Sequence, residues 1–293
     1  MIPEDVAAEV RRIEITTRHL VRDIVAGEYS AAFRGRGVEF AEVREYQPGD
    51  DVRTIDWNVT ARLGSAYVKR FLEERELTVL FVVDYSASGA FGTQRRSKRG
   101  LAVEVCAVLA LAAARSNDQV GAAFFTDRLE RYVPPRKGRR HVLRVIGELL
   151  AYQPVARGTD LAAGLLTLEP LLRRRSVLFV VSDFLSSGWR PSLGRLARRH
   201  DVIAVQLVDP RERQLPEVGL VALRDAETDD WAWVDTSSPA VQAHVRARVT
   251  GFDAELERAV RENQADLLRL DAGEPYGEPL IAFFRRRERM QWR

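Results

Sequence analysis

Short apolar runs alternate with helix-like segments along most of this chain, from about residue 77 to residue 270. Residues 77–83 form an almost unbroken apolar run, and residues 176–181 and 202–208 form two more. Runs of this length, rich in β-branched and aromatic residues, are typical of strands buried on both faces of a parallel sheet. Segments with helical spacing lie between and after them, at residues 100–115, 139–150, 161–172, 191–199, 241–263 and 279–289. The pattern predicts an α/β fold: a doubly wound, mostly parallel sheet with helices on both faces.

Further extended segments add to this sheet or to its edge. Residues 120–126 predict another strand, residues 129–133 pair with it after a short turn, and residues 265–270 form the last strand. Residues 218–236 contain two extended segments separated by the polar stretch from Glu227 to Asp230. This arrangement predicts a hairpin-like insertion.

The first 76 residues have a different pattern, so we divide the chain into 1–76 and 77–293. Residues 4–26 predict a helix that packs on a surface, and residues 28–76 predict a small β-rich segment dense in Gly, Arg and Asp. That segment is too short and too polar to bury a core of its own. We therefore expect it to pack on the main domain through Trp57 and a charged group, Arg44, Asp50, Arg53 and Asp56.

Composition and charge narrow the class of protein. The 293 residues are 46% hydrophobic and 30% charged, with a formal net charge of +3. This charge is far below that of a dedicated nucleic-acid-binding protein. No stretch approaches the roughly 20 apolar residues that span a bilayer, and the charged N-terminus is not a signal peptide. The single cysteine, Cys106, cannot form an intrachain disulfide. We expect a cytoplasmic protein. The chain has no phosphate-binding Gly-x-x-x-x-Gly-Lys-Ser/Thr loop, so it should not itself be an ATPase.

Oxygen-bearing side chains follow two of the predicted strands. After residues 77–83 come Asp84, Ser86 and Ser88, and after residues 176–181 come Ser182 and Asp183. Thr159 lies between them in the sequence, just before a predicted helix. If the two strands are neighbours, these groups converge at the carboxyl end of the sheet, where open α/β sheets bind ligands.

Hydroxyl and carboxylate oxygens at one spot suit Mg²⁺, which prefers oxygen ligands and keeps several waters. Only two carboxylates are present, those of Asp84 and Asp183, so the ion's charge is incompletely neutralised. A cation held in this way attracts a carboxylate from elsewhere.

The order Asp84-x-Ser86-x-Ser88, then Thr159, then Asp183 resembles the metal-ion-dependent adhesion site of von Willebrand factor A domains. The resemblance implies that Ser86, Ser88 and Thr159 contact Mg²⁺, or another divalent cation such as Mn²⁺, directly or nearly so. It also implies that Asp84 and Asp183 hold the ion's waters, and that an acidic residue of a partner protein takes the open position.

The segment before this site is similar to the signature of the "domain of unknown function 58" family, whose members carry an A-type domain after it. The matching residues are Gly37-Val38-Glu39-Phe40, Arg44-x-Tyr46, Gly49-Asp50-Asp51-x-Arg53-x-Ile55-Asp56-Trp57 and Ala61-Arg62. The family is linked to MoxR-type AAA+ ATPases, which are chaperone-like. The resemblance therefore implies a partner or adaptor of such an ATPase.

Three functions remain open at this stage. The leading hypothesis is a non-enzymatic, Mg²⁺-dependent protein-binding module. The runner-up is a Mg²⁺-dependent phosphoryl hydrolase with Asp84 as nucleophile, although Ser86 stands where that chemistry wants a second acid. Nucleic-acid binding ranks last because the basic clusters are not interleaved with aromatic residues. One of these clusters, residues 95–99, fits a contact with an acidic partner or a solvated loop equally well.

Overall fold

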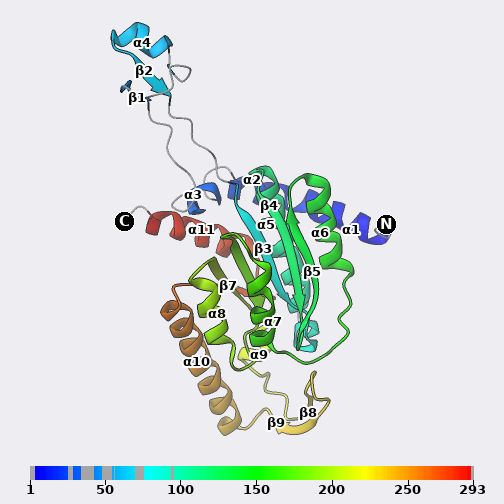
Figure 1. Ribbon diagram of the computed structural model, residues 1–293. Coiled ribbons are helices and arrows are strands. Elements are labelled where there is room, and N and C mark those ends of the chain that lie inside the picture. The colour runs from blue at the N-terminus through cyan, green and yellow to red at the C-terminus, as the bar shows by residue number, and fades with distance from the viewer. Residues whose placement is uncertain are drawn as a thin grey trace.

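A computed structural model describes residues 4–25, 29–33, 43–47, 55, 57–69, 76–93 and 96–291. Its centre is a six-stranded sheet with the strand order β10-β7-β6-β3-β4-β5 (Figure 1). The strands are β3 (Thr78–Asp84), β4 (Gln119–Phe125), β5 (Leu129–Arg136), β6 (Val177–Ser182), β7 (Asp201–Val208) and β10 (Asp266–Asp271). All neighbours are parallel except β4 and β5, which are antiparallel. The predicted α/β fold class is confirmed.

Strand β3 is in the middle of the sheet and is buried on both faces. It pairs in parallel with β6 on one side and with β4 on the other, with Val82 opposite Val180 and Ala123. Its residues from Val79 to Asp84 are all buried. Both faces of β3 contact other protein layers, and this explains why its sequence is a near-continuous apolar run. The strands at 77–83 and 176–181 are therefore neighbours, which is the condition under which the predicted site residues converge.

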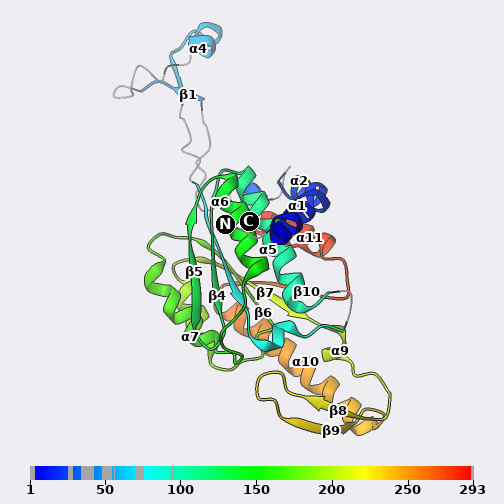
Figure 2. The same cartoon turned by 90° about the vertical axis from the view of Figure 1, so that its right-hand side faces the viewer.

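Helices cover both faces of the sheet, and the alternation of β3 side chains divides the core into two clusters. Val79, Phe81 and Val83 contact one layer, and Leu80 and Val82 contact the other. The first layer contains α1 (Glu4–Thr16), α2 (Arg18–Asp23), α3 (Tyr29–Phe33), α5 (Lys98–Arg115), α6 (Arg139–Ala151) and α11 (Gly277–Gln291). The second contains α7 (Leu161–Leu168), α8 (Trp189–Ala197) and α10 (Pro239–Glu262). Figure 2 shows both layers from the side.

Short helical turns occur near the ends of strands and helices: η4 (Ala87–Ala90), η5 (Glu169–Leu171) and α9 (Pro210–Arg213). In the part of the chain that the structure describes, no helix combines the length and the apolar character needed to cross a membrane.

The N-terminal helices are part of the core of the main domain. The predicted helix over residues 4–26 is split at Thr17, whose hydroxyl bonds Ile13 O at 2.6 Å. Val10, Ile13 and Ile24 are buried in the same cluster as β3, so the segment predicted to lie on a surface contributes one of its faces to the core. Helix α3, which the sequence pattern did not predict, buries Phe33 against α11.

A buried arginine connects the last helix to the sheet. Arg287 is 4% exposed and forms ion pairs with Asp201 at 2.5 Å and Asp266 at 2.6 Å. Its guanidinium carbon lies 4.8 Å from the centre of the Phe33 ring, close enough for a cation–π contact. Arg287 therefore ties α11 to β7, to β10 and to α3.

Within the 1–76 segment, β1 (Val43–Glu45) pairs antiparallel with β2 (Tyr67–Lys69), and α4 (Trp57–Leu63) lies between them in sequence. The two short strands agree with the predicted β-rich segment, whereas α4 was not predicted. Trp57 is 69% exposed, so its ring is not packed against the main domain as we expected. Asp50, Arg53 and Asp56 and the side chain of Arg44 lie outside the described residues, so the packing of this charged group stays a prediction.

The predicted insertion at 218–236 is a hairpin. Strand β8 (Leu220–Arg224) pairs antiparallel with β9 (Trp231–Asp235), with Ala222 opposite Trp233. In Figure 1 the hairpin, in yellow, lies below the end of the sheet where β3 terminates. The hairpin is therefore at the same end of the molecule as the predicted site residues.

Candidate functional site

The carboxyl ends of β3 and β6 are joined by a network of short hydrogen bonds. Asp84, at the end of β3, accepts one from Ser86 N at 2.9 Å and one from Ser182 Oγ of β6 at 2.7 Å. The Oγ atoms of Ser86 and Ser88 are 3.0 Å apart. Aspartate commonly bonds the backbone two residues on, and this turn brings the Ser86 hydroxyl next to that of Ser88. Asp84, Ser86 and Ser88 therefore come together as predicted.

Asp183 lies beside this network on the adjacent strand end. Phe184 adopts a positive φ of 61° and donates its backbone N–H to Ser182 Oγ at 3.0 Å, which turns the chain sharply after β6. Asp183 Oδ1 accepts a bond from Leu185 N at 3.1 Å. A cavity of about 10 Å³ is lined by Asp84, Ser88, Gly89, Lys98, Arg99, Ser182, Asp183 and Leu207. The carboxylates of both strands thus border one small space.

Thr159 comes from a neighbouring loop and has a different partner. Its loop is fixed by a bond from Ala87 N to Arg157 O at 2.9 Å, and by Asp160, whose side chain caps α7 through Ala163 N. The Thr159 hydroxyl donates to Glu227 of the β8–β9 hairpin at 2.5 Å. The loop of Thr159 therefore contacts the turn after β3 through Arg157 and Ala87, but the Thr159 hydroxyl bonds a glutamate that the sequence did not single out, and Thr159 does not line the cavity at Asp84.

A buried lysine, which sequence reasoning did not assign to the site, also lies here. Lys98 is 1% exposed, and its Nζ is 2.8 Å from Asp183 Oδ2 and 2.6 Å from Glu212 Oε1. Lys98 therefore neither lies in a solvated loop nor faces a partner, the two readings left open for residues 95–99. Lys98 occupies the first turn of α5, where the helix dipole makes a positive charge unfavourable. A lysine at this position therefore indicates a specific acidic partner.

The neighbouring Arg99 also contacts the site, through backbone atoms. Its Nη2 donates to Tyr85 O and Ser86 O, each at 3.1 Å. Arg99 thus places its charge against the loop that follows β3, while the charge of Lys98 lies against Asp183 and Glu212.

Burial strongly affects the charges of this site. Burial and the nearby charge of Asp183 raise the pKa of Asp84 to about 6, although the bonds from Ser86 and Ser182 act in the opposite direction. Burial alone would lower the pKa of Lys98. The charges of the Asp183 and Glu212 carboxylates together have a larger effect, so the pKa of Lys98 is raised. The site thus holds a carboxylate whose ionised form is disfavoured, and a cation near it would relieve that cost.

The donor atoms fit a hard divalent cation. Carboxylate and hydroxyl oxygens are the ligands that Mg²⁺ prefers, and Asp84, Ser88, Ser182 and Asp183 supply them to the cavity from the ends of two strands and the turn after β3. The cavity volume of about 10 Å³ is close to the space that one water-sized group occupies. Ser86, Ser88 and Thr159 would hold the ion with their hydroxyls, and Asp84 and Asp183 would bond its waters. The ion would supply an electrophilic position for an incoming carboxylate.

Glu130 of β5 fixes the loop that carries Thr159. Its carboxylate accepts bonds from Thr126 Oγ1 at 2.6 Å, Tyr152 OH at 2.5 Å, Val155 N at 2.8 Å and Ala156 N at 2.9 Å. Burial alone would raise the pKa of Glu130. The four hydrogen bonds together have a larger effect, and the pKa is lowered to about 2. The ionised carboxylate is therefore the form that holds the loop.

We expect Glu130→Gln to lower the free energy of unfolding by about 1–3 kcal/mol, because charge-assisted bonds to the loop are lost. Amide exchange at Val155 and Ala156 should accelerate. In the unaltered protein the contribution of Glu130 should be complete above the pKa of the unfolded chain, 4.5, and should be lost as the pH falls toward about 2.

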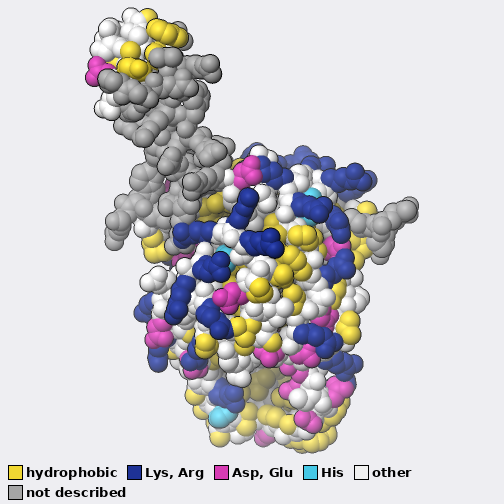
Figure 3. All heavy atoms as spheres, viewed as in Figure 1, with side chains coloured by type: hydrophobic (Ala, Val, Ile, Leu, Met, Phe, Trp, Pro, Cys, Tyr) yellow, Lys and Arg dark blue, Asp and Glu magenta, His cyan; other side chains and the backbone are white. Residues whose placement is uncertain are grey.

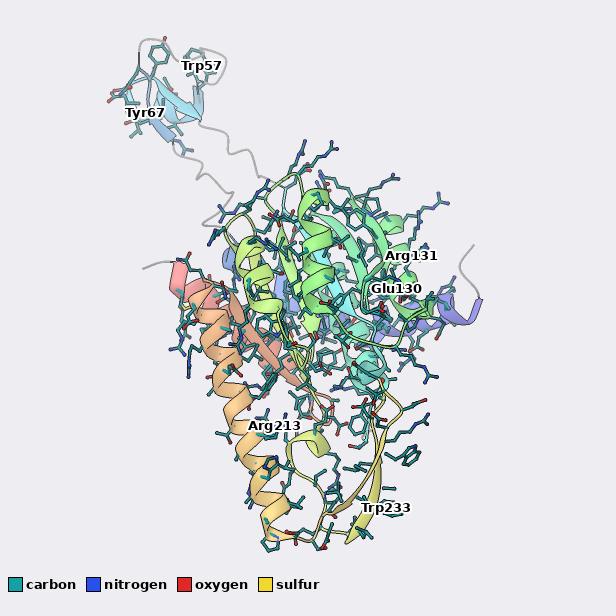
Figure 4. The ribbon with its side chains drawn as sticks, turned by 60° about the horizontal axis from the view of Figure 1, so that its bottom comes forward. Trp57, Tyr67, Glu130, Arg131, Arg213 and Trp233 are labelled. Atoms are coloured by element: carbon teal, nitrogen blue, oxygen red, sulfur yellow. The ribbon has the colours of Figure 1, made fainter. Side chains whose placement is uncertain are left out.

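The matched control is Glu148→Gln. It removes the partly exposed ion pair between Glu148 of α6 and Arg131, which lies next to Glu130 on β5 (Figure 4). It should change the free energy of unfolding by less than about 1 kcal/mol. Equal effects of the two substitutions in urea titrations would show that Glu130 does not anchor the loop.

A groove adjoins the site on the side of α10. It has a volume of about 570 Å³ and shares Asp183 and Glu212 with the surroundings of Lys98. Leu185, Leu207, Val208, Val245, Val249 and Phe252 form its apolar lining. Arg213, which pairs with Asp253, lies between α9 and α10 in Figure 4. Figure 3 shows a hollow lined by hydrophobic side chains at this end of the molecule.

Comparison with known sequences identifies the family. The family described as "Protein of unknown function DUF58" matches residues 42–254. The chain belongs to the DUF58 family. The resemblance found in the signature segment is thereby confirmed, and the match of this DUF58 protein extends through β3, the site loops and most of α10.

Two relatives match nearly the whole chain. The chain is 35% identical over 287 residues to the uncharacterized protein Rv1480 of Mycobacterium tuberculosis, covering 97% of this chain and 90% of that protein. The same figures hold for the uncharacterized protein Mb1516 of Mycobacterium bovis.

Among solved structures, the DUF58 chain resembles an aerotolerance-related membrane protein from Bacteroides fragilis, with a TM-score of 0.50 and 14% identity. That match covers 72% of this chain and 99% of the other. It also resembles BatB from Bacteroides thetaiotaomicron, with a TM-score of 0.47, 12% identity and coverage of 73% and 99%. The SpRpn10 VWA domain matches with a TM-score of 0.38, 11% identity and coverage of 71% and 94%. The first likeness supports the fold and nothing beyond it.

Proposed function

We propose that this DUF58 protein is a non-enzymatic protein-binding module whose site holds Mg²⁺ or a similar divalent cation such as Mn²⁺. Asp84, Ser86, Ser88, Thr159 and Asp183 would form the site, and an acidic residue of a partner protein would complete it. The observation that carries the proposal is the joint presence of Asp84, Ser86, Ser88, Ser182 and Asp183 at the ends of two adjacent strands.

The phosphoryl hydrolase is not favoured. Asp84 is 7% exposed, and both of its carboxylate oxygens accept hydrogen bonds, from Ser86 N and from Ser182 Oγ. A nucleophilic carboxylate also needs a second acidic group as general acid or base, and Ser86 stands at the position where that group is wanted. A binding role uses the same oxygens to position hydroxyls and waters.

The partner class that we propose is a MoxR-type AAA+ ATPase, for which this chain would act as an adaptor in chaperone-like assembly. Family membership supports this proposal, together with the apolar groove next to the site. Cytoplasmic location stays a prediction from the sequence.

The test is affinity capture with the immobilised full chain in Mg²⁺ and in EDTA, with the bound proteins identified by mass spectrometry. We expect a MoxR-type ATPase to be enriched in Mg²⁺ and lost in EDTA. Binding that persists unchanged in EDTA would overturn the metal-dependent mechanism. Capture of only other proteins would overturn the proposed partner.

A further inference from the structure

The hairpin β8–β9 places a carboxylate on the hydroxyl of Thr159, one of the residues predicted to hold the metal. Thr159 Oγ1 donates to Glu227 Oε1 at 2.5 Å, across 68 positions of sequence. Glu227 lies on the loop that joins β8 to β9, so it reaches the site from an element outside the main sheet. This contact joins one of the predicted metal-ligating hydroxyls to a carboxylate of the same chain.

The loop is built so that Glu227 keeps this position. Asp225 accepts bonds from Glu227 N at 2.8 Å and Thr228 N at 3.0 Å, and these bonds lower its pKa. Asp229 has a positive φ of 65° and bonds Asp225 O through its N–H at 3.0 Å. Asp225 N in turn bonds Asp230 O at 2.8 Å. The backbone around Glu227 is therefore closed into a defined turn.

A second contact holds the hairpin to the same site loop. Asp229 forms ion pairs with Arg157 at 3.2 Å and with Arg224 at 2.7 Å. Arg157 is two residues before Thr159 in the loop that bonds Ala87. The hairpin tip thus contacts this loop at two points, through Glu227 and through Asp229.

We infer that Glu227 is a further ligand of the candidate metal site and holds, within the chain, the place that a partner's acidic residue takes. The inference rests on the proposed function. Its chemical basis is that Asp84 and Asp183 leave a divalent cation incompletely neutralised, while Lys98 already pairs with Asp183. A carboxylate beside Thr159 supplies the missing charge. A partner's carboxylate therefore has to displace Glu227 and move the hairpin.

The displaced element has an unusual surface. Leu220, Trp231 and Trp233 are 65%, 65% and 72% exposed. The register places Leu220, Ala222 and Trp233 on one face of the hairpin. Exposed tryptophans are enriched among the residues that dominate binding energy at protein interfaces. The hairpin joins this aromatic face to the metal site, so the partner that fits is a protein with an acidic residue flanked by apolar ones.

The experiment compares the full-length protein with Glu227→Gln and with Asp230→Asn. Asp230 is an exposed acidic residue of the same loop, and its side chain makes no ion pair or hydrogen bond in the described structure. We expect Glu227→Gln to weaken Mg²⁺ binding in calorimetry by about tenfold or more, because a charged ligand is removed. Asp230→Asn should leave the affinity within about twofold.

Two further measurements separate the roles of Glu227. In hydrogen–deuterium exchange, Mg²⁺ should slow exchange over residues 225–230 in the unaltered protein and in Asp230→Asn, but not in Glu227→Gln. At saturating Mg²⁺, Glu227→Gln should increase capture of the metal-dependent partner several-fold, because no carboxylate of the chain competes.

The outcomes distinguish this inference from the proposed function. Equal Mg²⁺ affinity in all three proteins would overturn the role of Glu227 while leaving the metal site intact. Unchanged partner capture by Glu227→Gln would overturn the displacement step. The absence of Mg²⁺ binding to the unaltered protein would overturn both the inference and the proposed metal site.

Discussion

A shortened protein that begins at residue 76 is expected not to fold cooperatively. Removing α1, α2 and α3 takes Ala32 and six large apolar side chains out of the core: Val10, Ile13, Val21, Ile24, Tyr29 and Phe33, each no more than 6% exposed. Full burial of one such side chain contributes about 1.5–3 kcal/mol. Their sum is about the whole stability of a typical domain, which is about 5–15 kcal/mol. The truncation also uncovers Phe284 and Arg287 on α11.

Point substitutions test the same idea without deleting an element. Phe33→Ala should lower the free energy of unfolding by about 3–5 kcal/mol, because Phe33 is 2% exposed and contacts Tyr29, Phe284 and Arg287. Ile15→Ala, on the 66% exposed side chain of α1, should change it by no more than about 0.5 kcal/mol. Urea titration followed by circular dichroism measures both. A cooperative transition in the shortened protein would show that the sheet and its other helices suffice.

Asp84→Asn is expected to abolish Mg²⁺-dependent behaviour while leaving the fold intact. Asparagine keeps an acceptor oxygen for Ser86 N, and its amide can donate to the rotated Ser182 hydroxyl. It also removes the repulsion between the buried carboxylates of Asp84 and Asp183, which contributes to the raised pKa of Asp84. Without divalent cations, the unfolding temperature should therefore stay the same or rise.

Added Mg²⁺ distinguishes the variant from the unaltered protein. At a Mg²⁺ concentration 100 times the dissociation constant, the unaltered protein should gain about 2.7 kcal/mol of stability, and Asp84→Asn should gain close to none. Partner capture in Mg²⁺ should fall to the level seen in EDTA. The control, Asp230→Asn, changes an exposed carboxylate and should keep both responses. An Asp84→Asn protein that retains the Mg²⁺-induced shift would refute the assignment of Asp84 to the site.

The sequence predicted the framework of the site because that framework depends on local patterns. The apolar runs at β3 and β6 could only be strands covered on both sides, and their ends necessarily carried Asp84 and Asp183. The hairpin at 218–236 was also predicted, since it depends on residues close together in the chain. Helices α3 and α4 were missed because segments of five and seven residues have too few turns to show a helical period.

Contacts between distant segments could not be obtained from the same patterns. Lys98 looked like one member of a basic cluster, but the fold places it against Asp183 and Glu212, 85 and 114 positions away. The burial of Lys98 depends on which strands are neighbours and on how α5 and α9 pack. The spacing of residues along the chain does not encode either of these. The predicted packing of Trp57 was wrong for a related reason, because aromatic character alone does not specify which surface a ring covers.

The sequence by itself determined the α/β class, the central strand β3 and the set of oxygen donors at its carboxyl end. Each of these follows from side-chain type at a short spacing, which fixes the faces of a strand and the residues that follow it. Only the tertiary structure decided the surroundings of those donors: the ammonium of Lys98 on Asp183 and the carboxylate of Glu227 on Thr159. The physical reason is that charge neutralisation in a buried site depends on distances in space, and those distances are set by packing.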